Sequence, residues 1–158
     1  MAVDEDLGAR LVSLHEVIAR LRRECPWDRV QTHASLAPHA LDEAAELAEA
    51  LQAAHDAMSG SAHDQATAIE DLVSELGDVL LQVLMNAAIG EQAGTFTLGE
   101  VLATIEAKML RRHPHVFVRD PDAPEPSDDE LSVQWEAIKK AERAARANRI
   151  AAREAQTP

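Results

Sequence analysis

The sequence lacks tyrosine altogether and has few other aromatic residues, with two tryptophans and two phenylalanines among 158 residues. Its single cysteine, Cys25, excludes an internal disulfide and a metal–thiolate cluster. Alanine, leucine and glutamate are abundant, and these residues favour helices over strands. We find no internal repeat and no pattern typical of a strand. The composition therefore predicts an all-α fold in one domain, a helical bundle of four to five helices that is large enough for a hydrophobic core.

Several catalytic and targeting signals are missing as well. The seven histidines form no HExxH motif and no His–Cys set, which argues against a zinc enzyme. There is no GxSxG motif, no phosphate-binding glycine loop and no dinucleotide fingerprint. We also find no signal peptide and no apolar run of membrane-spanning length. The sequence therefore predicts a cytoplasmic protein with no membrane partner.

Positive charge is absent from the middle of the chain. All fifteen Lys and Arg residues lie outside 31–107, and this stretch carries the whole net charge of −13. Such a field repels nucleic acid polymers, and it repels a small phosphorylated substrate unless divalent cations lie between them. Simple solubility would explain the sign of the charge equally well. We expect no nucleic acid polymer as a partner.

A ridge of polar residues runs along the predicted third helix. At about 100° per residue, five side chains share one narrow face: Asp71, Glu75, Asp78, Gln82 and Asn86. The rest of this helix is apolar from 79 to 85, which is typical of a helix at the centre of a bundle. Because buried carboxylates need a charged partner, the ridge predicts a bound cation.

The predicted second helix supplies matching acids. Glu43 and Glu46 are three residues apart, and so are Glu75 and Asp78, so each pair can reach one point beside its helix. Two such pairs can surround a hard cation with oxygen atoms, which Mg²⁺ prefers. The alternative interpretation is two ordinary acidic helix faces in an acidic chain.

Helix ends follow from proline, glycine and capping residues. We expect Pro38 in the first turn of the second helix and the end of the third helix at 90–94. Capping boxes at Thr97–Glu100 and Ser127–Glu130 predict the starts of the fourth and fifth helices.

These boundaries also divide the chain. We predict a helical core with the metal site at 1–119, a proline-rich linker at 120–126, and a C-terminal helix with a basic tail of the same domain at 127–158.

A cluster of bases marks the end of the predicted fourth helix. Lys108, Arg111 and Arg112 are the first bases after the long stretch without any. Cations at a helix C-terminus complement the helix dipole, which would explain the cluster fully. A clamp for phosphate groups explains it equally well.

Five sequence motifs, taken together, resemble those of a known protein family. They occur in the order CPWDRVQTH, DEAAE, ELGDVLLQV, KMLRRHPHVF and WEAIKKAE, from about Leu21 to Glu142. This order closely resembles the MazG family of nucleoside triphosphate pyrophosphohydrolases. The resemblance implies an all-helical and usually dimeric enzyme that depends on Mg²⁺, with Mn²⁺ as a substitute. It implies hydrolysis of NTPs or dNTPs to a monophosphate and pyrophosphate, and with it a role in sanitising the nucleotide pool.

The resemblance also implies roles for individual residues. The family pattern EExxE followed by ExxD places the metal ligands and catalytic acids at Glu43, Glu46, Glu75 and Asp78. Nucleotide contacts fall on Lys108, Arg112, Trp135 and Lys139. Asp42 replaces the usual first Glu of the pattern and is one methylene shorter. We therefore expect Asp42 to support a ligand rather than to bind the metal itself.

Other departures from the family leave the substrate open. Ala37, His39, Ala40 and Ala45 stand where bulkier or charged residues are usual, so neither base nor sugar is predicted. A narrower hydrolase of the same superfamily is an alternative, such as a dUTPase or a phosphoribosyl-ATP pyrophosphohydrolase. A helical module that binds nucleotide or metal without turnover is another. The intact set of four acids argues against that module.

The apolar third helix also bears on assembly. Leu81, Leu84 and Met85 lie on several sides of it, and one copy of the chain has few helices with which to cover them. We therefore expect a homodimer or a dimer of dimers. In that assembly Trp135 and Lys139 would close over the site.

Overall fold

The computed structural model describes residues 6–118, 120, 122 and 124–154, without the side chains of 153 and 154. Its helices are α1 (Leu7–Glu24), the 3₁₀-helix η1 (Asp28–Val30), α2 (His33–Ala57), α3 (Ala62–Ala93), α4 (Leu98–Arg112), α5 (Pro114–Phe117) and α6 (Asp128–Glu154). This part of the chain contains no strand, so the predicted all-α fold is confirmed.

The chain divides into two compact units, which we describe separately. The described residues up to Val101 form the first unit, and those from Leu102 onward form the second. The predicted division into a core, a linker and a C-terminal helix stays a prediction. Positions 119, 121 and 123, at and near the predicted linker, and the last four residues of the predicted tail, 155–158, lie outside the described residues.

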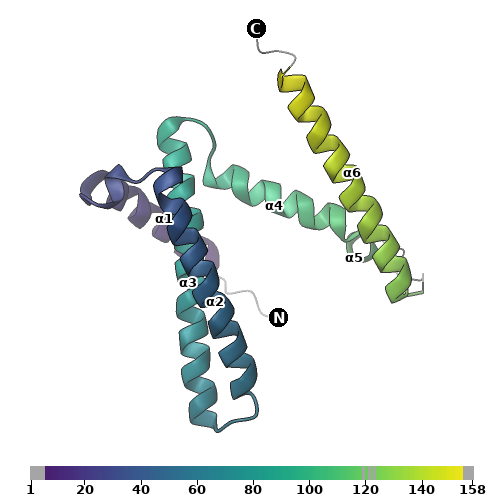
Figure 1. The fold of residues 1–158 in the computed structure, drawn as a ribbon, viewed down its shortest axis with the longest axis horizontal. Helices are drawn as coiled ribbons and strands as arrows, with labels where there is room; N and C mark the ends of the chain where they lie inside the picture. The colour runs from purple at the N-terminus through teal and green to yellow at the C-terminus, as the bar shows by residue number, and fades with distance from the viewer. Residues whose placement is uncertain (1–5, 119, 121, 123, 155–158) are drawn as a thin grey trace. The chain divides into compact units, whose positions relative to one another are not determined.

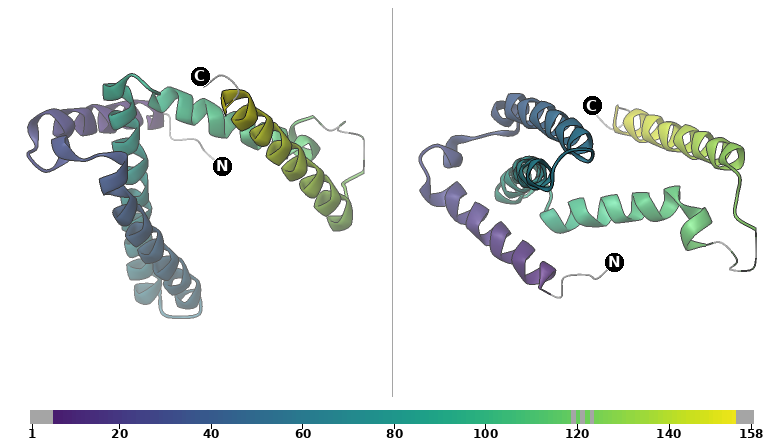
Figure 2. Two further views of the ribbon diagram at one scale, coloured as in Figure 1. Left: turned by 45° about the horizontal axis from the view of Figure 1, so that its top comes forward. Right: turned by 90° about the horizontal axis from the view of Figure 1, so that it is seen from below.

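Helices α2 and α3 pair side by side in opposite directions as a hairpin (Figure 1), and the views in Figure 2 show the same pairing. Ser61 caps the start of α3, where its hydroxyl accepts from the Asp64 amide and the Asp64 carboxylate accepts from the Ser61 amide. At the other end, Gly94 adopts a left-handed conformation with φ 65°. Glycine takes this conformation without steric cost, so α3 ends within the predicted range.

The predicted start of α2 was wrong. Thr32 caps the helix, which begins at His33, so that Pro38 lies inside it rather than in its first turn. The Thr32 hydroxyl accepts from the Ser35 amide at 3.1 Å, and the Ser35 hydroxyl accepts from the Thr32 amide at 2.8 Å. This reciprocal cap stabilises the extra turn. Pro38 lacks the backbone N–H that would donate to the carbonyl oxygen four residues earlier, so the helix loses one hydrogen bond there.

The core of the first unit lies where α1, α2 and the second half of α3 meet. It consists of Ile18, Leu36, Leu84, Met85, Ala87, Ala88 and Leu98. Leu84 and Met85 are therefore buried within one copy of the chain, and the prediction that they need a second copy was wrong. The reason is that α1 and the first turn of α4 cover this part of α3, whereas Leu81 remains 37% exposed.

A buried arginine ties the segment after α1 to α3. Arg22 is only 7% exposed and donates to the carbonyl oxygens of Asp28 and Gln31 and to Oε1 of Gln92. The guanidinium thus fixes η1 and the start of α2 against the end of α3. This contact places the turn that leads into the helix carrying Glu43.

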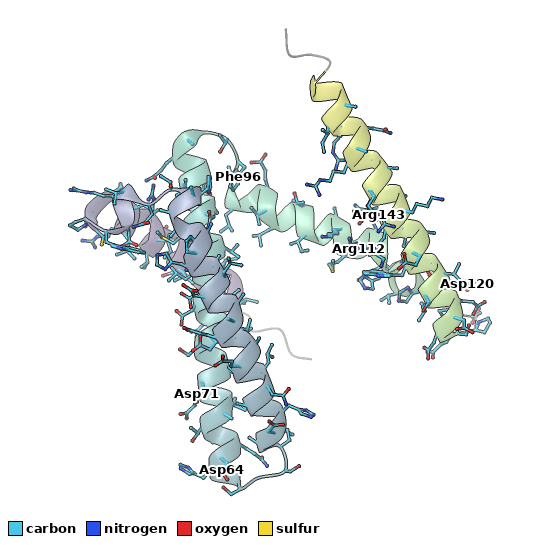
Figure 3. The ribbon with its side chains drawn as sticks, in the orientation of Figure 1. Asp64, Asp71, Phe96, Arg112, Asp120 and Arg143 are labelled. Carbon is cyan, nitrogen blue, oxygen red and sulfur yellow. The ribbon has the colours of Figure 1, made fainter. Side chains whose placement is uncertain are left out.

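Gly90 makes room for Phe96 where the chain turns back from α3. A Cβ atom on Gly90 would lie 2.7 Å from ring carbons of Phe96. Figure 3 labels Phe96 beside this end of α3. The ring also stacks on His33, with centroids 5.9 Å apart. The small residue at 90 therefore allows the aromatic ring to reach the start of α2.

By length and composition, α3 would suffice to cross a membrane, so the prediction that no such run exists was wrong. This is weak support for a membrane span, because the core helix of a folded unit passes the same test. Helix α3 carries Glu75 and Asp78 and packs along α2 and α1. We therefore describe it as the core helix of the first unit.

The second unit comprises α4 from Leu102, α5 and α6. Helix α4 ends at Arg112, and His113 alone separates it from α5, which begins at Pro114. The predicted capping box at the start of α6 is confirmed, because the Ser127 amide donates to the Glu130 carboxylate at 2.8 Å and the Glu130 amide donates to the Ser127 hydroxyl. The guanidinium groups of Arg111 and Arg112 both pair with Glu142, which joins α4 to α6.

Candidate active site

Three carboxylates from two helices meet on the α2–α3 hairpin. Glu43 comes from α2, and Glu75 and Asp78 come from α3. One oxygen of each lies within 4.8 Å of the others, and all three residues are half-buried. The spacing of three along α3 places its two acids on one face, and the hairpin brings Glu43 opposite them. The structure therefore joins three of the four acids that the sequence singled out.

Glu75 is the least satisfied member of this acid cluster. Its Oε2 atom is buried and has no hydrogen-bond partner among the described residues. Desolvation raises the pKa of the Glu75 carboxyl above its ordinary value of 4.5, and the charges of Glu46, Asp78, Glu43 and Asp71 raise it further. A buried oxygen surrounded by like charges is costly unless a cation or a proton compensates it.

Glu46 and Asp71 lie at the margin of the cluster. Both are exposed, and neither belongs to the group of three oxygens. Each still acts on Glu75 through its charge, and Glu46 contributes the largest electrostatic effect of the four neighbouring acids. Figure 3 labels Asp71 on α3 about two turns beyond Asp64. A side-chain rotation would be needed for Glu46 to join the other three.

The donor set fits a hard divalent cation. Every candidate ligand is a carboxylate oxygen, and Mg²⁺ and Mn²⁺ both prefer oxygen. The unpaired oxygen of Glu75 and the raised pKa of its carboxyl also fit a site that binds a cation. Glu43, Glu75 and Asp78 are the residues that would hold it.

The polar ridge continues along α3 past the acids. Gln82 and Asn86 are half-buried, like Glu75 and Asp78, so four of the five ridge residues avoid full exposure. His33 Nδ1 donates to Asn86 Oδ1 at 2.7 Å. The Asn86 amide nitrogen in turn donates to the backbone oxygen of Gln82 at 2.8 Å. The Asn86 side chain, at the far end of the ridge, therefore has hydrogen-bond partners for both its oxygen and its nitrogen.

The second unit gathers three of the four predicted nucleotide contacts. The Arg112 guanidinium lies over the Trp135 ring, 4.9 Å from its centroid, and Lys139 Nζ lies 5.8 Å from the same centroid. Lys139 also pairs with Glu136 on α6. Lys108 is half-buried on α4, and among the described residues it shows no ion pair.

Sequence reasoning missed Glu142 as the partner of this basic cluster. Its carboxylate accepts hydrogen bonds from both Arg111 and Arg112, and these bonds lower the pKa of Glu142 from 4.5 to about 2. The same contact raises the pKa of Arg112. Glu142 lies in α6, thirty residues from Arg112, so no local spacing could have revealed the pair.

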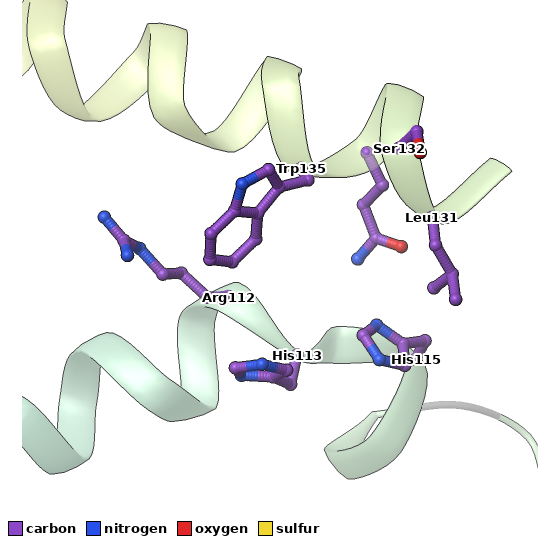
Figure 4. A pocket seen from close by; sticks show the side chains of 7 residues that line it. Arg112, His113, His115, Leu131, Ser132 and Trp135 are labelled. Carbon is purple, nitrogen blue, oxygen red and sulfur yellow. The ribbon is translucent and has the colours of Figure 1, made fainter. Parts of the chain in front are cut away.

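A groove opens beside Arg112 (Figure 4). It has a volume of about 340 Å³ and is lined by Arg112, His113, His115, Leu131, Ser132, Gln134 and Trp135. The His113 ring lies 6.2 Å from the Trp135 ring and 5.6 Å from the His115 ring, centroid to centroid. Nδ1 of His115 is buried without a hydrogen-bond partner in the described part of the chain. The groove thus combines aromatic faces with a fixed guanidinium.

Comparison with known proteins places these features in a family. Residues 31–117 match the MazG nucleotide pyrophosphohydrolase domain, and this segment contains the acid cluster and the bases of α4. The chain belongs to the MazG family. The match includes more than half of the chain, and the resemblance noted from the sequence is confirmed.

Individual relatives support this assignment. The chain is 38% identical over 137 residues to the nucleoside triphosphate pyrophosphohydrolase/pyrophosphatase MazG of Thermotoga maritima. It is 35% identical over 142 residues to the nucleoside triphosphate pyrophosphohydrolase of Escherichia coli. It is also 41% identical over 133 residues to an uncharacterized protein, YabN, of Bacillus subtilis. These matches cover 83% to 90% of the chain.

The relatives are longer than this chain, which spans 48% of the Thermotoga and Escherichia proteins and 24% of the Bacillus protein. A solved structure of matching size also exists. The crystal structure of a MazG-related protein from Thermotoga maritima aligns with a TM-score of 0.60 and 25% sequence identity, over 81% of this chain and 97% of that one.

Proposed function

We propose that this protein is a Mg²⁺-dependent nucleoside triphosphate pyrophosphohydrolase, with Mn²⁺ as a substitute cation. It would cleave NTPs or dNTPs between the α and β phosphates and release a monophosphate and pyrophosphate. The observation that carries the proposal is the cluster of Glu43, Glu75 and Asp78, with its buried, unpaired oxygen on Glu75. The names of the relatives support the same reaction.

In this proposal Glu43, Glu75 and Asp78 would hold the cation, and Glu46 would turn inward to join them as a further ligand. A cation held there would supply positive charge against the triphosphate and would lower the pKa of the attacking water. This neutralisation matters because 31–107 contains no Lys or Arg that could face a phosphate group. An acid of the cluster that does not bind the cation fully would accept the proton of that water.

Lys108, Arg112, Trp135 and Lys139 are proposed to contact the nucleotide. Arg112 is held by Glu142 at one side and lies over Trp135 at the other, so its guanidinium is oriented before substrate arrives. A fixed guanidinium loses little conformational freedom when it binds phosphate. Charge-assisted hydrogen bonds from Arg and Lys stabilise the negative charge that develops on departing pyrophosphate.

Product analysis tests the proposed reaction. Phosphorus NMR of a nucleoside triphosphate incubated with protein and Mg²⁺ should show a monophosphate and pyrophosphate, and neither should form when the cation is chelated. A diphosphate with orthophosphate would mean cleavage at the other anhydride bond and would exclude this reaction. A panel of canonical and oxidised NTPs and dNTPs, compared by kcat/KM, would then test the proposed role in sanitising the nucleotide pool.

We further propose a homodimer or a dimer of dimers in the cytoplasm. Ile69, Val73 and Leu76 on α3 are each at least 48% exposed in one copy, and a second copy would cover them. Sedimentation equilibrium at micromolar concentration checks this, and a fully active monomer would contradict it. Mixing a Glu75→Gln chain with a Lys139→Ala chain would show, through regained activity, whether the site is shared between copies.

A further inference from the structure

Gln82 carries a second unsatisfied oxygen on the same helix face as the acid cluster. Its Oε1 atom is buried and has no hydrogen-bond partner among the described residues. Gln82 follows Asp78 by four residues, so it lies on the same face about 6 Å further along α3. Helical side chains lean toward the N-terminus of their helix, which directs Gln82 back toward the turn of Asp78.

The next residue of the ridge, Asn86, makes no hydrogen bond to this oxygen. Asn86 lies one turn further on, and its amide nitrogen donates to the backbone oxygen of Gln82 rather than to Oε1. The Asn86 Oδ1 atom accepts from His33 Nδ1 at 2.7 Å, and His33 stacks on Phe96. This chain of contacts holds Asn86 in place and leaves Gln82 Oε1 free to accept a hydrogen bond. An acceptor that is buried without a partner is costly, so we look for its donor in a ligand.

A triphosphate cannot be that donor. At neutral pH its oxygens only accept hydrogen bonds, and they are expected beside the cation of the acid cluster. The first donors along a nucleotide, moving away from the phosphates, are the hydroxyl groups of the sugar. Gln82 lies one helical turn, about 6 Å, from Asp78. This is similar to the distance between a phosphate group and the sugar hydroxyls of one nucleotide.

We propose that Gln82 Oε1 accepts a hydrogen bond from a sugar hydroxyl of the substrate and thereby selects among nucleotides by their sugar. This inference rests on the proposed pyrophosphohydrolase function and names a part of the substrate that the acids do not recognise. A site that leaves a buried acceptor unpaired rejects an analogue without the matching donor. Substrates with the hydroxyl are therefore preferred over analogues that lack it.

The test compares three substrates with one base: the ribonucleoside triphosphate and its 2′-deoxy and 3′-deoxy analogues. The parent protein should prefer the full sugar over one analogue by about tenfold in kcat/KM, and the analogue that loses activity identifies the hydroxyl. Gln82→Met keeps the side-chain length without the acceptor and should abolish the preference. Gln82→Glu keeps an acceptor and should retain it. Gln52→Met, on an exposed residue of α2 that donates to Asp56, is the matched control and should behave as the parent.

Other outcomes would overturn the proposal. If Gln82→Met loses the same activity on all three substrates, Gln82 does not recognise a sugar hydroxyl. It would then contact the phosphates or a water molecule, or only pack against its neighbours. A fall in Mg²⁺ affinity of Gln82→Met without nucleotide, measured by calorimetry, would make Gln82 a cation ligand instead. If the parent releases no pyrophosphate from any substrate, the proposed function fails separately. Calorimetric binding of the same three nucleotides would then still show whether Gln82 distinguishes their sugars.

Discussion

The pKa of a glutamate is raised in the first unit and lowered in the second. In the first unit, burial and neighbouring acids raise the pKa of Glu75, and one of its oxygens has no partner. In the second unit, Arg112 and Arg111 lower the pKa of Glu142 to about 2, and its carboxylate accepts several hydrogen bonds. A glutamate carboxylate of the first unit thus has an oxygen without a hydrogen-bond partner among the described residues, whereas both oxygens of Glu142 accept hydrogen bonds in the second.

The difference has a physical cause in each unit. The acids on α2 and α3 repel one another, so they gain from any cation that binds between them. On α4, Arg111 and Arg112 pair with Glu142, and Arg112 also lies over Trp135, so these two bases are positioned without a ligand. Substitutions in the acid cluster should therefore affect catalysis most strongly and should not harm the fold.

The largest effect is expected from the acids themselves. Glu43→Gln, Glu75→Gln and Asp78→Asn should each lower kcat by about 100-fold or more, because each removes a proposed cation ligand. Glu46→Gln should also abolish turnover if Glu46 turns inward as proposed. Without Mg²⁺ the melting temperature of these variants should hold or rise, because like-charge repulsion is removed. Steady-state kinetics and thermal denaturation check both.

Glu70→Gln is the matched control for this series. Glu70 is an exposed acid of the same helix, α3, outside the group of three oxygens, and its replacement should leave turnover unchanged. Turnover at the parent level in any two of the cluster variants would show that these acids do not form the metal site.

A smaller effect is expected from the bases. Lys108→Ala and Arg112→Ala should lower kcat/KM by about 10- to 150-fold, since a lost charge-assisted hydrogen bond costs about 1.5–3 kcal/mol. Mg²⁺ affinity without nucleotide should not change. Arg143→Ala, on an exposed residue of α6, is the control. Kinetics equal to the parent would show that Lys108 and Arg112 do not contact the nucleotide.

A glycine-to-alanine substitution should destabilise the fold near the end of α3, at Gly90, but not in its middle, at Gly77. Gly90→Ala should destabilise the fold by about 1–3 kcal/mol, because the new methyl group would meet the Phe96 ring at 2.7 Å. Gly77→Ala meets nothing within 4 Å and should stabilise the helix by about 0.5–1 kcal/mol. Urea denaturation measures both. Equal stability of the two variants would mean that Phe96 moves aside at no cost.

The smallest effect, and the most direct test of the comparison, is the pH dependence of stability without metal. The raised pKa of Glu75 makes its carboxyl stabilising only while protonated, and this stability is lost as pH rises above its folded pKa. Glu75→Gln should therefore melt higher than the parent at pH 7 and equally at low pH. Glu142→Gln should melt lower at pH 7, and its difference from the parent should vanish as pH falls from 4.5 to about 2. Shifts of the same sign at pH 7 would contradict the contrast between the units.

Much of the local structure could be predicted because its causes lie close together in sequence. The box of Thr97 and Glu100 forms as expected, with the Thr97 amide donating to the Glu100 carboxylate at 2.8 Å. The spacing of Glu75 and Asp78 along α3 likewise determined that they share a face. The prediction from Pro38 of where α2 begins was wrong, because the cap formed by Thr32 and Ser35 stabilises a helix start five residues earlier, at His33.

The sequence by itself determined the all-α fold, the pairing of acids within each helix and the absence of bases around them, since each depends on helical periodicity or composition. Only the tertiary structure decided that Glu43 rather than Glu46 completes the group with Glu75 and Asp78. It alone paired Glu142 with Arg112 and buried Leu84 and Met85 under α1 and α4. These outcomes depend on how helices rotate and meet across dozens of residues. Periodicity along one helix cannot specify that geometry, because from 79 to 85 every face of α3 other than the ridge is apolar.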